Sequence, residues 1–123
     1  MRQKTLKIIY WVLLILFSGF MVFSGIQELL HTPSADKVMT DLGYPTYLNT
    51  IIGMAKLLGV IALLQTMYKT IKEWAYAGFT IDILGAGISM ALAGAGIMGL
   101  IMILPFLLVL FVIYFLGKKT GYL

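Results

Sequence analysis

The chain has 123 residues, of which 61% are hydrophobic and 11% are charged, with a formal net charge of +4. Soluble domains average roughly 45–50% apolar and about 25% charged residues, so this composition excludes an ordinary soluble domain and indicates an integral membrane protein. The sequence contains no cysteine, which excludes disulfide frameworks, thiolate metal sites and dithiol redox chemistry.

Four apolar runs predict four membrane-spanning helices in a single transmembrane domain over residues 1–123. The runs cover about residues 8–30, 47–67, 74–93 and 97–116. Each can cross roughly 30 Å of hydrocarbon at about 1.5 Å per residue. They are too long and too continuously apolar for transmembrane β-strands. The first run also exceeds the apolar segment of a secretory signal peptide, so we expect it to be retained. The sequence therefore predicts an all-α fold, an antiparallel bundle of four transmembrane helices.

The link between the first two runs predicts a short helix. Thr32 and Pro33 are typical of a helix start, and Gly43 of a helix end. Three apolar side chains share one face of this segment, so we expect the helix to lie on the outer membrane surface. The later links are brief, which makes consecutive spans antiparallel neighbours, and Pro105 is expected to bend the fourth span.

The basic residues indicate the orientation of the chain. One side of the predicted bundle carries both termini and the link between the second and third spans. Seven of the nine basic residues fall on that side: Arg2, Lys4, Lys7, Lys69, Lys72, Lys118 and Lys119. Cytoplasmic segments are enriched in Lys and Arg, so both termini are predicted to lie in the cytoplasm, in a plasma or inner membrane. The orientation of the chain in the membrane accounts for its net positive charge. We therefore expect no nucleic-acid binding.

Two opposite charges lie inside the predicted spans. Lys56 is roughly 14 Å deep in the second span and Asp82 roughly 12 Å deep in the third. A charge in hydrocarbon costs at least about 2.5–3.5 kcal/mol, so each requires a partner or a function. The two spans are consecutive and antiparallel, and the two side chains can therefore meet as a buried ion pair. A structural clip is the commoner role for such a pair, and contacts to a ligand are the alternative.

Glu28 is a third charge, near the outer end of the first span. Ser24 and His31 share its helix face, so this stripe could line the mouth of a cavity. The alternative, which we favour, places Glu28 at the level of the lipid headgroups. His31 is the only histidine and is read as a helix-end residue, and no metal site is expected.

Small residues accompany these charges. Gly53 and Gly59 flank Lys56, while Gly78, Gly85 and Ser89 share a helical stripe with Asp82. Small residues at such spacing let membrane helices approach closely. We therefore predict that these five positions pack helices together.

Four blocks of sequence motifs occur in a characteristic order between residues 8 and 89. They are Phe23-Ser24-Gly25 with Leu29-Leu30-His31; Leu42-Gly43-Tyr44-Pro45 with Tyr47-Leu48; Gly53-x-Ala55-Lys56-Leu57-Leu58-Gly59; and Lys72-Glu73-Trp74-Ala75-Tyr76-Ala77-Gly78-Phe79 with Asp82 and Gly85-Ala86. In this order they resemble the DoxX-like family of small four-span membrane proteins. The fourth span matches only as an apolar run.

The resemblance implies a four-helix membrane bundle, with Lys56 and Asp82 at positions that match the family pattern. The family name comes from the small membrane subunit of an archaeal thiosulfate:quinone oxidoreductase. A related eukaryotic branch includes a chaperone for nicotinic acetylcholine receptors. The sequence departs from the family at Met90, where a histidine often follows the serine. A polar corner is thereby lost, which weakens a redox role.

These observations leave three functions open. The first is an accessory subunit of a quinone-linked membrane redox system, with a hydrophobic cavity at Lys56, Asp82 and Glu28 for a quinone or a lipid. The second is an assembly factor or chaperone for a larger membrane protein. The third is a small proton- or solute-coupled transporter, which at four spans would be small unless it forms a homodimer. The residues offer no self-contained catalytic constellation, so the sequence favours a non-enzymatic protein.

Overall fold

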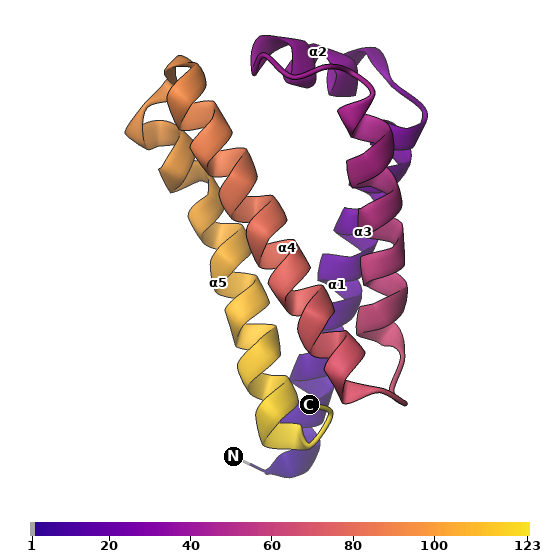
Figure 1. The fold of residues 1–123 in the computed structure, drawn as a ribbon. Helices are drawn as coiled ribbons and strands as arrows, with labels where there is room; N and C mark the ends of the chain where they lie inside the picture. The colour runs from indigo at the N-terminus through magenta and orange to yellow at the C-terminus, as the bar shows by residue number, and fades with distance from the viewer. Residues whose placement is uncertain (1) are drawn as a thin grey trace.

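A computed structural model describes residues 2–123, which form five α-helices and one short π-helical segment (Figure 1). In chain order these elements are α1 (Gln3–Leu29), α2 (Pro33–Asp41), α3 (Leu48–Leu64), α4 (Lys69–Met90), η1 (Ala91–Ala95) and α5 (Ile97–Thr120). The prediction of an all-α fold is confirmed.

Three of the helical segments are long and apolar enough to cross a membrane. They are α1, α4 continued by η1, and α5, with 27, 27 and 24 residues. At most 28% of the residues in their apolar windows are buried, so most of their apolar side chains are left to face lipid. Helix α3 is apolar but has only 17 residues, about 26 Å at 1.5 Å per residue. The four-span arrangement therefore stays a prediction.

Helix α4 begins at residue 69, before the expected start of the third span at residue 74. The side chain of Gln65 organises the link in front of it. Its amide nitrogen donates to the carbonyl oxygens of Ala62 and Tyr68 at 3.0 and 2.8 Å, and its oxygen accepts from two backbone N–H groups. The link needs few residues because one side chain satisfies its backbone groups. Helix α3 consequently ends at residue 64, short of the expected 67.

The link between α4 and α5 reverses the chain through two glycines. Gly94 has φ 120° and Gly96 has φ 61°, backbone conformations that other residues rarely adopt. Helix α5 then continues past Pro105 to Thr120, four residues beyond the predicted 116.

The helices are arranged as two pairs. Helices α1 and α3 lie side by side, as do α4 and α5 (Figure 1). The pairs are close at the end that holds both termini and separate toward the end that holds α2 (Figure 1). Fully buried side chains, among them Tyr10, Leu14 and Ile113, belong to a core cluster to which α1, α3, α4 and α5 all contribute.

Glycines set the closest approach between α1 and α3. A Cβ atom on Gly53 would lie 2.7 Å from the carbonyl oxygen of Gly25. The two backbones therefore touch, and this contact brings the neighbouring turns of the two helices together. Gly59 similarly packs against the ring of Phe79 from α4. A Cβ atom on Gly59 would lie 2.9 Å from that ring.

Helix α2 forms where the link sequence predicts it. Thr32 is its N-cap, accepting a hydrogen bond from the N–H of Ala35 at 3.3 Å, and Pro33 occupies its first position. Gly43, with φ 84°, follows its end. The position of α2 on a membrane surface stays a prediction.

Candidate functional site

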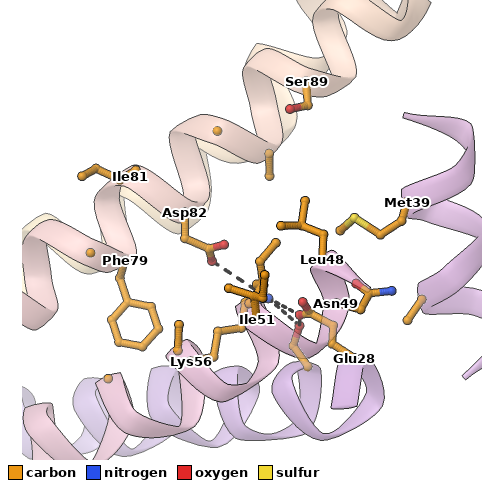
Figure 2. A pocket seen from close by; sticks show the side chains of 18 of the residues that line it. Glu28, Met39, Leu48, Asn49, Ile51, Lys56, Phe79, Ile81, Asp82 and Ser89 are labelled. Atoms are coloured by element: carbon orange, nitrogen blue, oxygen red, sulfur yellow. Dashed lines mark hydrogen bonds and ion pairs between the residues drawn. The ribbon is translucent and has the colours of Figure 1, made fainter. Parts of the chain in front are cut away.

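A cavity of about 910 Å³ lies between the separated helix pairs, and we call it the wedge cavity (Figure 2). Residues of α1 and α3 form one wall, residues of α4 form the other, and residues of α2 contribute at the far end. Most of the lining is apolar, including Met39, Leu48, Ile51 and Phe79. Ligand sites are mostly apolar clefts of roughly 300–1,000 Å³ with a few fixed polar groups. The wedge cavity fits this description.

Three charged side chains meet in the wedge cavity. The Lys56 ammonium donates a hydrogen bond to Ser24 Oγ at 2.9 Å and forms a hydrogen-bonded ion pair with Glu28. Asp82 lies across the cavity on α4, with its Oδ2 3.9 Å from Lys56 Nζ (Figure 2). One base and two acids give this cluster a formal charge of −1. We call Glu28, Lys56 and Asp82 the charge cluster.

The close contact between α1 and α3 explains the tight Lys56–Glu28 pair. Glu28 follows Gly25 by three residues and Lys56 follows Gly53 by three residues, so the glycine contact lies one turn from both charged side chains. Ser24, four residues before Glu28, donates to its carboxylate at 3.1 Å. Glu28 is 8% exposed. The predicted ion pair of Lys56 and Asp82 is present at 3.9 Å, and the structure adds Glu28 as a second, nearer partner of Lys56. The position of Glu28 relative to the lipid headgroups stays a prediction.

The small residues of α4 form a wall of the wedge cavity. Nothing lies within 4 Å of a Cβ built on Gly78 or Gly85, and both line the cavity with Ser89. No other helix packs against these two glycines within residues 2–123, because α4 diverges from α3 here, so the helix-packing role of the three residues stays a prediction. Ser89 instead shares a hydrogen bond of 2.6 Å with the hydroxyl of Tyr44, from the loop after α2.

A network of polar side chains connects α2 to α3 and to the end of α1. His31 Nδ1 lies 3.0 Å from Asp36 Oδ1, and His31 Nε2 lies 2.7 Å from Thr50 Oγ1. The amide of Asn49 also donates to Asp36 Oδ1 at 3.0 Å. The hydrogen bond from Asn49 and the adjacent His31 hold the pKa of Asp36 below its usual range. We call His31, Asp36, Asn49 and Thr50 the α2 clasp.

A second buried cation lies outside the wedge cavity. Lys72 is 1% exposed and donates to the hydroxyl of Tyr10 at 3.1 Å. Its ammonium also lies 5.7 and 5.5 Å from the centres of the Tyr10 and Tyr122 rings, which stack on each other. From the sequence, Lys72 is only one of the basic residues on the side of the termini, because the hydropathy of α4 gives no sign of this aromatic cage.

The apolar helices and the enclosed charge cluster define the class of the protein as an α-helical membrane protein with an internal cavity. The model of the DoxX-like family matches residues 12–114, and the chain belongs to this family. The suspected resemblance is thereby confirmed. No curated protein and no solved structure matches the chain.

Proposed function

We propose that this DoxX-like protein is an accessory membrane subunit of a quinone-linked redox system and that its wedge cavity holds a quinone or a lipid. The observation that carries the proposal is an apolar cavity of about 910 Å³ with buried charges in its wall. Apolar walls suit a ring and a tail, while the few polar groups fix the orientation of a head.

The two tryptophans of the chain provide a direct binding assay. Trp74 lines the wedge cavity, whereas Trp11 packs against Tyr10 and Tyr122 in the aromatic cluster near the termini. Quinones quench tryptophan fluorescence on contact. In the Trp11→Phe variant, decylubiquinone should quench Trp74 with a saturating dependence on concentration.

The matched control is Trp74→Phe, which leaves only Trp11. Quenching in this variant should follow the non-saturating partition of decylubiquinone into detergent or nanodisc lipid. Purified protein should also carry a co-extracted quinone or lipid. Quenching of Trp74 that never saturates, together with an extract free of bound quinone and lipid, would refute the proposed cavity function.

The open wall of α4 favours a second candidate, an assembly factor for a larger membrane protein. Gly78 and Gly85 leave space above their Cα atoms, which a helix of a client protein could occupy. Purification in mild detergent should then yield a stoichiometric partner, and Gly85→Leu should remove it. A chain that always purifies without another protein argues against this candidate.

A further inference from the structure

The charge cluster of the wedge cavity has carboxylate oxygens that its own donors do not reach. Lys56 directs its ammonium to Ser24 and to one oxygen of Glu28, and the Ser24 hydroxyl donates to that same oxygen at 3.1 Å. These donors converge on Glu28 Oε1. Asp82 lies 3.9 Å from the ammonium, beyond the range of a hydrogen bond.

Two buried acceptors in the cavity wall have no hydrogen-bond partner among residues 2–123. They are the second carboxylate oxygen of Glu28 and the side-chain oxygen of Asn49. The orientation of the Asn49 amide is fixed, because its nitrogen donates to Asp36 and an ionised carboxylate only accepts. Asn49 is fully buried and Glu28 is 8% exposed. Buried acceptors left unpaired are unfavourable, so no described donor satisfies these two oxygens beside the charge cluster.

Asp82 is the acceptor that a ligand meets first. Its side chain is 27% exposed and points into the cavity from α4 (Figure 2), whereas the unpaired oxygens of Glu28 and Asn49 are enclosed. No hydrogen bond to the Asp82 carboxylate forms among the described residues, and the charge cluster has a formal charge of −1. A ligand group that donates hydrogen bonds therefore complements the Asp82 carboxylate, and a group that only accepts does not.

Resting on the proposed function, we infer that the wedge cavity binds the reduced, dihydroxy form of a quinone in preference to the oxidised form, with Asp82 accepting from one hydroxyl. The two carbonyl oxygens of a quinone only accept, while the two hydroxyls of a quinol donate. Binding alone is involved, and no bond to the ring is made or broken. A tenfold preference corresponds to a shift of about 30 mV in the potential of the bound two-electron couple.

The test compares ligands that differ in their donors. Decylubiquinol, decylubiquinone and the dimethyl ether of decylubiquinol are titrated by calorimetry into protein in nanodiscs without oxygen. The dissociation constant for the quinol should be lower than that for the quinone by about tenfold to a hundredfold, the range of one hydrogen bond to a charged group. The dimethyl ether keeps the ring but has no hydroxyl, so it should bind no more tightly than the quinone.

Two variants test whether Asp82 causes the preference for quinol over quinone. Asp82→Asn supplies an amide donor in place of a carboxylate. The preference for quinol should then fall to less than about threefold, because the hydrogen bond that gives the whole tenfold to hundredfold preference is lost. Glu73→Gln makes the same chemical change on the same helix, at a side chain that pairs with Lys118 outside the wedge cavity. This control should keep the full preference.

The outcomes separate the inference from the proposed function. If no quinone, quinol or ether binds, the quinone-binding part of the proposed function fails and the inference fails with it. If quinone binds as tightly as quinol, or the ether as tightly as quinol, the inference fails while the proposed function stands. A preference that persists in Asp82→Asn overturns the role of Asp82. Equal binding of dodecanol, which has a hydroxyl without a ring, would identify an aliphatic lipid instead and overturn the inference. The ligand series on the native chain decides the inference even if Asp82→Asn does not fold.

Discussion

The charge cluster predicts an asymmetry between substitutions of its base and its acids. Lys56→Met leaves Glu28 and Asp82 with a combined charge of −2, in a cluster where the Glu28 side chain is only 10% exposed. Removing one partner of a buried pair costs roughly 3–5 kcal/mol. Glu28→Gln costs less, because the remaining ammonium still has Asp82, 3.9 Å away, and the cluster becomes neutral. We expect a loss of about 1–2 kcal/mol, near that of one hydrogen bond to a charged group.

The assay is equilibrium unfolding in mixed micelles with increasing SDS, followed by circular dichroism. The double variant Lys56→Met with Glu28→Leu should recover at least about half of the loss caused by Lys56→Met, because only Asp82, the more exposed of the two carboxylates, is then left without the lysine. The matched control is Lys118→Met. Lys118 pairs with Glu73 at 2.7 Å, but both side chains are 45% exposed, so this loss should stay below about 1 kcal/mol.

Equal losses from Lys56→Met and Glu28→Gln would refute the reasoning, because they would show that Asp82 does not compensate Lys56. A Lys56→Met loss no larger than that of the control would also refute it, since the pair would then be solvated.

Three further predictions test other parts of the fold. Gly53→Ala should lower the free energy of unfolding by about 1–3 kcal/mol, because the new Cβ would lie 2.7 Å from a backbone oxygen of α1. Gly78→Ala should be neutral or stabilising, because nothing lies within 4 Å of its new Cβ. Equal losses from the two in the SDS assay would contradict the close contact. Tyr10→Phe should cost about 1–3 kcal/mol by removing the hydrogen bond to the buried lysine of α4. Tyr76→Phe should cost less, because the Tyr76 hydroxyl makes no hydrogen bond of normal geometry and its neighbour is the Tyr10 hydroxyl. A reversed order in the same assay would disprove the cage. The pKa of Asp36 is lowered in the folded chain, so the α2 clasp should stabilise the folded chain at neutral pH. This stabilisation should be lost as the pH falls through the lowered pKa, which lies below the ordinary 3.8. Hydrogen-exchange protection of α2 should drop there, and a drop that persists in Asp36→Asn would assign it to another group.

The helices were predictable because each signal is local. Continuous apolar runs identify α1, α4 and α5, and the pair Thr32-Pro33 identifies the start of α2. The boundary of α4 was missed because Gln65 satisfies four hydrogen bonds of the preceding link. Nothing in its own sequence neighbourhood distinguishes that glutamine from a solvated one.

For the candidate site, the sequence predicts which residues take part but not how they pair. Buried charge is costly, and this identified Lys56 and Asp82. Which acid lies closer depends on how α1 rotates against α3, and that rotation follows from a contact between two distant glycines, Gly25 and Gly53. A stripe of small residues on one helix fits both a packed interface and a cavity wall. Gly85 lines the cavity wall because the two helix pairs diverge there.

The rim of the wedge cavity determines from which phase a ligand arrives. Its lining includes Ile51 and Leu58 of α3 and Trp74 and Ile81 of α4, and each of these side chains is more than half exposed. If the helices span the membrane as predicted, such side chains touch acyl chains and the opening leads sideways into the bilayer. A lipophilic ligand then reaches the cavity by diffusion in two dimensions. Occupancy follows the mole fraction of that ligand in the surrounding lipid, and nanodiscs loaded at different ligand-to-lipid ratios are the natural scale on which to express affinity.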